Sequence, residues 1–206
     1  PLVREQINGE RYYLNTETGK KYISVTTLLS RIPNEHLEAW KEESGLNGEL
    51  IASTARIRGN SLHGYVESFL RNEPVIRNRN DEGAEMFDIL KPALEQNVSE
   101  VYAVELQMWS DIMGLAGTMD GAVKWAGLPT ILDIKNSSRP KTAKEIISYF
   151  IQVQIYLLMA AERYKFYAKQ TVILMATLEL PMPLIFLNGK MDYAREVSKL
   201  IRKYGD

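Results

Sequence analysis

Residues 114–138, GLAGTMDGAVKWAGLPTILDIKNSS, contain two strand-like segments joined by a short connection. The first segment alternates around Gly117 and Gly121, and the second is a short apolar run that ends in charge. A connection this short favours antiparallel pairing of the two segments, which brings Asp120 close to Asp133. The stretch therefore predicts the central hairpin of a sheet with acidic side chains gathered at one point.

Hydrophobic periodicity organises the rest of the chain around this hairpin. Period-two patterns predict strands at 101–108, 171–178 and 184–187 and a hairpin at 10–25, and helical spacing predicts helices at 36–44, 50–71, 82–95, 141–164 and 191–204. A strand that returns to the sheet through a helix implies partly parallel pairing, with helices on the faces of the sheet. We therefore expect an α/β (α+β) fold with a mixed sheet.

Length and composition set limits on the domain count and the chemistry. With 206 residues, 45% hydrophobic and 25% charged, the sequence is typical of one globular domain, which we expect to span 1–206. Residues 1–95 form its N-terminal hairpin and helices, and 96–206 its core. Because the chain has no cysteine, disulfides, zinc knuckles and iron–sulfur clusters are excluded. Any metal must be held by carboxylate, imidazole, carbonyl or water, ligands that suit Mg²⁺ or Mn²⁺.

Charge and apolar patterning bear on partners and compartment. The net charge of −1 argues against a uniformly basic nucleic-acid binder. Residues 135–144 nevertheless carry four basic residues and no acid, a run that fits either a contact with a phosphate backbone or a solvated loop. The apolar stretch 146–161 is too polar and too short to span a bilayer. The N-terminal PLVREQINGERYY has neither an apolar signal core nor a transit pattern. We expect a monomer in the cytoplasm of a bacterial or phage-infected cell, with the mitochondrial matrix as the alternative.

The segment Asp133-Ile134-Lys135 carries the most specific chemistry. In a strand, the ammonium of Lys135 lies on the same face as the carboxylate of Asp133, and Ile134 points to the other face. Together with Asp120, these groups can assemble a hydrated divalent ion, a water nucleophile and a phosphate. The alternative is an exposed ion pair worth about 0–1 kcal/mol beside an Asp-Gly turn.

The pattern of Asp120 followed thirteen positions later by Asp133-Ile134-Lys135 resembles the motif of the PD-(D/E)XK nuclease superfamily, although no proline precedes Asp120. RGNSLH at 58–63 with Glu67 is similar to the RG-x-x-x-H-x-x-x-E helix of RecB-like exonucleases, and 152–156 matches their Q-x-x-x-Y motif. SVTT at 24–27, LEAW at 37–40 and Val104-Glu105 look like the mitochondrial genome maintenance exonuclease branch and its phage relatives. The resemblance covers about residues 22–188 of the chain.

This resemblance implies a restriction-endonuclease-like core and a role for each matched residue. The implied metal ligands are Asp120, Asp133, His63, the carbonyl of Ile134 and Glu105. The implied catalytic residues are Lys135, Asp120, Asp133, Gln152 and Tyr156. The implied nucleic-acid contacts are Arg58, Ser137, Ser138, Lys141 and Trp40, and Glu67 shares a helix face with His63. The helical region 36–71 implies an arch over the site.

Simpler interpretations exist for several of these residues. His63 with Glu67 fits a core or surface histidine beside a solvated acid, and Gln152 fits a satisfied core amide. Trp40 fits core packing. We expect a divalent-metal-dependent DNA exonuclease that prefers single strands or strand ends and leaves 5′-phosphates. The alternatives are a catalytically inactive nucleic-acid-binding scaffold of the same fold and a duplex-cutting endonuclease.

Overall fold

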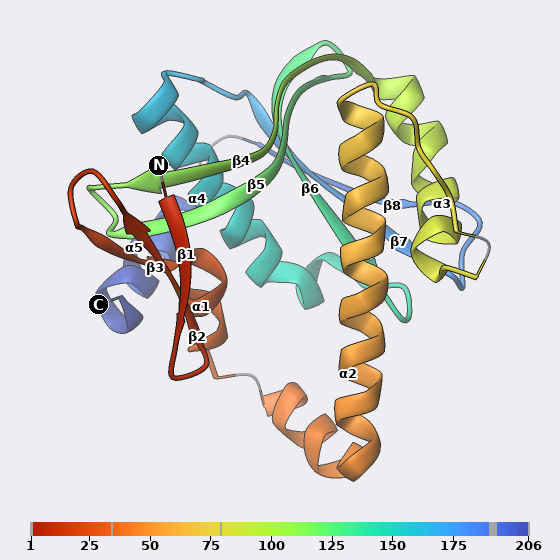
Figure 1. Cartoon of the computed structure of the whole chain (residues 1–206), viewed down its shortest axis with the longest axis horizontal. Helices are drawn as coiled ribbons and strands as arrows, with labels where there is room; N and C mark the ends of the chain where they lie inside the picture. Colours follow the sequence, from red (N-terminus) through yellow and green to blue (C-terminus); the bar gives the residue numbers. More distant parts are fainter. Residues whose placement is uncertain (1, 34, 79, 190–192, 206) are drawn as a thin grey trace.

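The segments that were expected to form the central hairpin do so, as strands β5 and β6 (Figure 1). The computed structural model describes residues 2–33, 35–78, 80–189 and 193–205, without the side chains of 35–47. The elements are β1 (Leu2–Ile7), β2 (Glu10–Asn15), β3 (Lys21–Ser24), α1 (Val25–Ser30), α2 (Glu35–Leu70), α3 (Glu82–Asn97), β4 (Val98–Ser110), β5 (Leu115–Trp125), β6 (Leu128–Ser137), the 3-10 turn η1 (Ala143–Ile146), α4 (Ile147–Tyr164), β7 (Gln170–Thr177), β8 (Leu184–Gly189) and α5 (Ala194–Tyr204).

Within the described residues, eight strands form one mixed sheet in the order β1-β2-β3-β5-β6-β7-β8, with β4 also paired to β5. β6 and β7 are parallel and are connected through α4, and β3 pairs with β5 in parallel. The remaining pairs are antiparallel. The prediction of a mixed sheet flanked by helices is therefore confirmed.

Helices cover both faces of this sheet with separate apolar clusters. On one face, α2 and α3 bury Leu62 and Phe87 against Leu132 of β6. On the other face, α4 buries Ile151 and Ile155 in a cluster that also includes residues of α1 and α5. In Figure 1, α2 and α3 lie side by side beside the strands, and α4 and α5 lie on the other side of the sheet. The candidate functional residues lie where these layers meet at β5 and β6.

Several elements differ from the sequence prediction. Strand β1 and the short helix α1 were not predicted, because the three consecutive polar residues in the middle of β1 break the period-two alternation and α1 is only 6 residues long. The predicted helices 36–44 and 50–71 are parts of one helix, α2, since a glycine inside a helix costs only about 1 kcal/mol. The predicted helix 141–164 begins instead with η1, and only the later part of the predicted helix 191–204 lies within the described residues.

Two further predictions concern membrane-spanning segments and a helical arch over the site. No helix in the described part of the chain is both long and apolar enough to cross a membrane, as expected. The arch over the site stays a prediction. Figure 1 shows the start of α2 turned away from the axis of its longer part, and Trp40 lies in this segment, where side chains are outside the described residues.

Candidate active site

Three acidic residues lie in one row across neighbouring strands. The register of β4 and β5 places Glu105 opposite Asp120, between paired residues on either side. The β5–β6 ladder ends at Gly121 and Leu132, so the next residues are Asp120 on β5 and Asp133 on β6. One carboxylate from each of three adjacent strands therefore lies at the same level of the sheet.

Two local irregularities open the sheet at this row. The backbone of Glu105 has φ 49°, in the left-handed region, where a non-glycine residue costs about 1–3 kcal/mol. On the other strand, the N–H of Ile134 donates to Oδ2 of Asp120 at 2.7 Å. A side chain thus takes the place of the backbone partner at the point where β5 and β6 separate. Such strain is found most often at functional sites.

His63 on α2 completes a cluster of potential metal ligands. Its Nδ1 lies 3.5 Å from Asp120 Oδ1 and 3.9 Å from Glu105 Oε1. One ligand atom of each of the three residues lies within 4.8 Å of those of the other two. Burial by itself lowers the pKa of His63, but the charge of Asp120 and hydrogen bonds toward Asp120 and Glu105 outweigh it and raise this pKa to about 10. His63 therefore carries a proton that a cation would displace.

Asp133 and Lys135 form a buried pair beside this cluster. Lys135 Nζ lies 2.6 Å from Asp133 Oδ2, which confirms that the two side chains share a face, and Ile134 packs in the α2–α3 cluster on the other side. Asp133 is only 1% exposed, and neither of its carboxylate oxygens has a well-formed hydrogen bond among the described residues. Two buried acceptor oxygens held only by one ammonium are costly and point to an additional ligand.

The charges of the site act on one another. Burial raises the pKa of Asp133 to about 6, the ammonium of Lys135 opposes this rise, and the charge of Asp120 adds to it. Burial also works against the charged form of Asp120, but His63, Lys135 and the N–H of Ile134 hold its pKa below the ordinary value. For Lys135, burial is outweighed by Asp133 and Asp120, which raise its pKa. Lys135 is therefore an ammonium at neutral pH.

The Q-x-x-x-Y residues line the same pocket from α4. Gln152 Nε2 donates to the hydroxyl oxygen of Tyr156 at 3.3 Å, and burial raises the pKa of Tyr156 above its ordinary value. The tyrosine ring packs directly against β5, where a Cβ on Gly117 would lie 2.7 Å from its Cε1 atom. A glycine is therefore required at position 117 for this close approach. Among the described residues, the side chain of Gln152 has a hydrogen bond to Tyr156 alone, which leaves it capacity for another partner.

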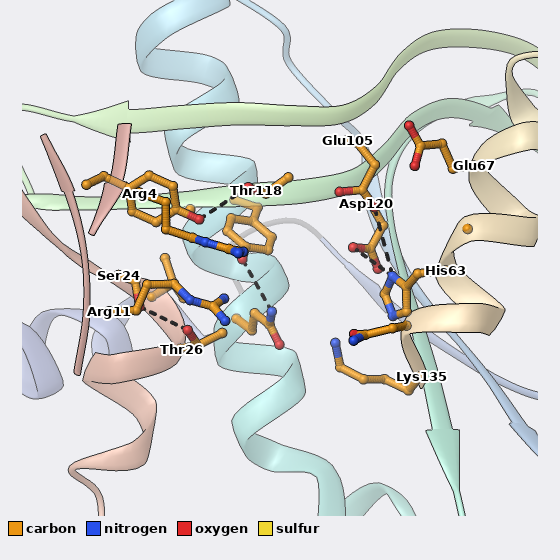
Figure 2. A pocket seen from close by; sticks show the side chains of 17 residues that line it. Arg4, Arg11, Ser24, Thr26, His63, Glu67, Glu105, Thr118, Asp120 and Lys135 are labelled. Atoms are coloured by element: carbon orange, nitrogen blue, oxygen red, sulfur yellow. Dashed lines mark hydrogen bonds and ion pairs between the residues drawn. The ribbon is translucent and has the colours of Figure 1, made fainter. Parts of the chain in front are cut away.

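These residues surround a cavity of about 440 Å³. His63, Glu67, Glu105, Asp120, Lys135, Gln152 and Tyr156 all line it, as do Arg4, Arg11, Tyr13, Ser24, Val25, Thr26, Asn60, Gly64, Gly117 and Thr118. Figure 2 shows two walls, with Arg4, Arg11, Ser24 and Thr26 on one side and the acidic cluster with His63 and Lys135 on the other. The arginine wall was not predicted, because nothing in the sequence marks Arg4 and Arg11 apart from the strand pattern of the hairpin.

The remaining predicted residues whose side chains are described, Asp133 and Ile134 among them, lie outside the cavity lining. Arg58 Nη1 is bound to Glu82 at 3.1 Å, Ser137 is buried at the end of β6, and Ser138 is exposed. Lys141 Nζ lies over the Tyr149 ring at 5.5 Å, and Lys135 Nζ lies over the same ring at 5.2 Å. Their roles as nucleic-acid contacts stay predictions.

Ion pairs partly neutralise the charge of Glu67 and of the basic run 135–144. Glu67 lines the cavity and forms an ion pair with Arg71 Nη2 at 2.9 Å. Within the basic run 135–144, Arg139 pairs with Glu145, in addition to the pair of Lys135 with Asp133. The run therefore offers fewer free cations to a phosphate backbone than its sequence indicated.

The donor set fits Mg²⁺ or Mn²⁺. Carboxylates and one imidazole are the ligands, and the repulsion within the acidic row together with the orphaned oxygens of Asp133 would be relieved by a cation. His63, Glu105 and Asp120 lie close enough to share one ion. Asp133 is not part of this cluster among the described residues and is paired with Lys135 instead, so its role as a ligand stays a prediction. The carbonyl of Ile134 as a ligand stays a prediction.

The fold of the chain has a counterpart among solved structures. It is similar to that of a structure described as "Crystal structure of SSO0001", with a TM-score of 0.51, 18% sequence identity, and coverage of 88% of this chain and 73% of that chain. At this identity the likeness shows the fold alone. No protein-family model matches the sequence, and no curated protein matches it.

Proposed function

We propose that the protein is a divalent-metal-dependent deoxyribonuclease with a restriction-endonuclease-like core, of the PD-(D/E)XK superfamily and its RecB-like exonucleases. The observation that carries this proposal is the junction of β5 and β6, where Glu105, Asp120, His63 and Lys135 line one cavity and Lys135 pairs with the buried carboxylate of Asp133 behind it. The positive charges of His63 and Lys135 balance the acidic cluster, and Arg4 and Arg11 make the opposite wall of the cavity cationic. This arrangement suits a negatively charged phosphodiester.

His63, Glu105, Asp120 and Asp133 would hold the metal in this proposal. A bound Mg²⁺ or Mn²⁺ would polarise the scissile phosphoryl oxygen and lower the pKa of a water molecule. The protein itself fixes the ligands: the N–H of Ile134 orients the carboxylate of Asp120 through Oδ2 and leaves Oδ1 directed toward His63. The left-handed backbone of Glu105 presents a third carboxylate to the same point.

Lys135 would act on the phosphate as a cation. Its raised pKa keeps the ammonium protonated, so its contribution is to donate hydrogen bonds to a non-bridging oxygen and to stabilise the charge that develops there. Tyr149 supports its position, because Lys135 Nζ lies 5.2 Å from the centre of that ring. Gln152 lines the same cavity with spare hydrogen-bonding capacity for the substrate.

Within this class, we favour an exonuclease that acts on single-stranded DNA or strand ends and leaves 5′-phosphates. The support is the Q-x-x-x-Y helix and the His63 helix, both of which line the cavity. A duplex-cutting endonuclease uses the same core chemistry, and an inactive scaffold would keep the fold without cleavage. These remain the competing outcomes of the test.

The test is degradation of 5′- and 3′-labelled single- and double-stranded DNA with Mg²⁺, Mn²⁺ or EDTA. Asp133→Ala and Lys135→Ala are compared with Lys124→Ala, a control whose ammonium pairs with Glu100 on the surface. We expect metal-dependent loss of single strands that the first two substitutions abolish and the control retains. Binding without cleavage under every metal would favour the scaffold, and internal cuts in duplex DNA the endonuclease. Full activity of a folded Lys135→Ala variant would contradict the proposal.

A further inference from the structure

The N-terminal hairpin supplies the cationic wall of the cavity. In the β1–β2 ladder, Arg4 pairs with Tyr13 and Gln6 pairs with Arg11, so Arg4 and Arg11 are diagonal neighbours on one face. Both arginines line the cavity, and Figure 2 shows them across it from Glu105 and Asp120. The hairpin lies outside residues 22–188, which carry the nuclease resemblance. This wall is therefore a separate addition to the candidate metal cluster.

The two guanidinium groups are available to a ligand. Neither Arg4 nor Arg11 has a side-chain ion pair or hydrogen bond in the described part of the chain, and both side chains are exposed. The acidic residues of the cavity lining are on the opposite wall. The hydroxyls of Thr26 and Thr118 line the cavity too, with Thr118 Oγ1 3.2 Å from the Tyr13 hydroxyl. Unpaired guanidinium groups beside hydroxyl groups form a site for a phosphate.

We propose that Arg4 and Arg11 bind a second phosphate group of the nucleic-acid strand, distinct from the phosphodiester at the metal cluster. This inference rests on the proposed function. The cavity of about 440 Å³ is of the size that holds a small ligand. A strand with one phosphate at the acidic wall and another at the arginine wall would be fixed in register across β5. The hairpin thus sets which phosphodiester is presented for cleavage.

The test measures binding in EDTA, so that cleavage does not interfere. Fluorescein-labelled oligothymidylate is titrated with the wild type, Arg4→Gln/Arg11→Gln, Arg4→Lys/Arg11→Lys, and Arg202→Gln, an exposed arginine of α5. We expect the Gln pair to bind at least about fivefold more weakly and to lower the salt dependence by about 0.7 for each phosphate that is no longer neutralised. The Lys pair should keep the salt dependence, and the control should bind as the wild type does.

Oligonucleotides with a 5′-phosphate, a 3′-phosphate or neither identify the source of the phosphate. If the wall holds a terminal phosphate, the advantage of one phosphorylated end disappears in the Gln pair. If it holds an internal phosphate, all three substrates lose affinity equally. Either result supports the subsite. Equal binding and an equal salt dependence of the wild type and the Gln pair would overturn it, as would a wild type that binds no single strand.

Failure of this inference is distinguishable from failure of the nuclease proposal. A wild type that binds through the arginines but cleaves nothing with Mg²⁺ or Mn²⁺ keeps the subsite and loses the enzyme. A wild type that cleaves DNA, while the Gln pair binds and cleaves normally, keeps the enzyme and loses the subsite. Thermal melting of each variant shows whether it folds, and exposed positions in the hairpin should tolerate these changes.

Discussion

Asp120 Oδ2 accepts the backbone N–H of Ile134 at 2.7 Å, just beyond Gly121 and Leu132, the last pair of the β5–β6 ladder. The contact does two things. It satisfies a backbone donor that the separating strands would leave unpaired, and it turns the other oxygen of the carboxylate toward His63. One hydrogen bond therefore both compensates for the separation of the two strands and orients a potential metal ligand.

Asp120→Asn should separate these two roles. The amide oxygen can still accept from Ile134, so we expect the variant to fold, but the lost negative charge should weaken Mn²⁺ binding at least about tenfold. Without that charge the pKa of His63 should fall from about 10, because Asp120 is the main group that raises it. Calorimetry measures the first effect, and NMR titration of His63 without metal measures the second. Asp111→Asn is the control, since Asp111 pairs with Lys20 and Arg163 on the surface. Unchanged Mn²⁺ affinity would remove Asp120 from the ligand set.

The sequence predicted most of the sheet and the acidic core of the site, for identifiable reasons. The β5–β6 hairpin is short, strongly patterned and local, and Asp133 and Lys135 share a face by strand alternation alone. The contact of His63 with Glu105 depends on how α2 packs across β4, which the family resemblance supplied and periodicity did not. The arginine wall depends on β1, a strand in which three consecutive polar residues interrupt the apolar alternation that marks a strand.

Asp133→Asn should stabilise the metal-free protein at neutral pH. The folded-state pKa of about 6 lies above the ordinary 3.8, so the folded protein holds this proton more tightly than the unfolded chain. Stability is therefore lost as pH rises from about 4 to about 6, and the loss is fully present at higher pH. The amide of the variant resembles the protonated carboxyl group and does not ionise, so it avoids this loss of stability. The free energy of unfolding of the variant should therefore exceed that of the wild type by about 1–3 kcal/mol at pH 7 in EDTA.

Thermal melting over a pH series tests this prediction for Asp133. The melting temperature of the variant should exceed that of the wild type by several degrees above pH ~6 and equal it below pH ~4. A variant that is less stable at every pH would mean that the Lys135 pair stabilises the ionised form more than burial opposes it. Adding Mn²⁺ should reverse the order, because only the wild type keeps the full ligand set.

Gly117→Ala should destabilise the protein and disturb Tyr156. The new methyl group would lie 2.7 Å from Tyr156 Cε1 and 3.0 Å from its hydroxyl oxygen, and the ring is buried. Overpacking of this kind costs about 1–3 kcal/mol. Gly64→Ala is the matched control, because a Cβ there meets nothing within 4 Å and α2 should gain about 0.5–1 kcal/mol. Urea unfolding of both variants measures the two effects, and equal stability of Gly117→Ala and the wild type would show that Tyr156 can move aside.

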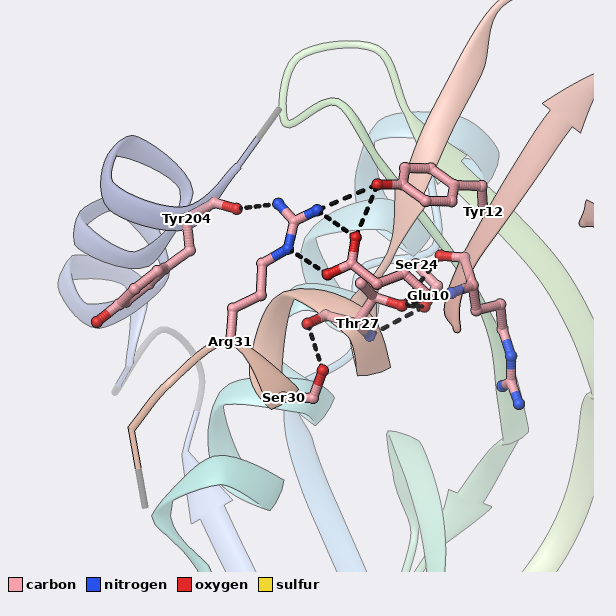
Figure 3. Close-up of polar contacts among 8 residues, drawn as sticks. Glu10, Tyr12, Ser24, Thr27, Ser30, Arg31 and Tyr204 are labelled. Atoms are coloured by element: carbon pink, nitrogen blue, oxygen red, sulfur yellow. Dashed lines mark hydrogen bonds and ion pairs between the residues drawn. The ribbon is translucent and has the colours of Figure 1, made fainter. Parts of the chain in front are cut away.

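Glu10 and Arg31 tie the hairpin to two helices, as Figure 3 shows. Arg31 Nε and Nη2 donate to the two carboxylate oxygens of Glu10 at 2.8 and 2.7 Å, and Nη1 donates to the carbonyl of Tyr204 at 2.7 Å. The hydroxyl of Tyr12 donates to Glu10 Oε2 at 3.0 Å. Hydrogen bonds from Arg31 and Tyr12 lower the pKa of Glu10 to about 2. The carboxylate is thus ionised in the folded protein well below the pH at which the unfolded chain takes up a proton.

Glu10→Gln should therefore lower stability in a pH-dependent way. The folded-state pKa of about 2 lies below the ordinary 4.5, so the stabilisation is complete above pH 4.5 and is lost as pH falls toward 2. The gap in melting temperature between the wild type and Glu10→Gln should be constant near neutral pH and narrow across that acidic range. Glu17→Gln, at an exposed turn residue, should show no gap. A gap that does not change with pH would mean that Glu10 stabilises the protein by packing rather than by its charge.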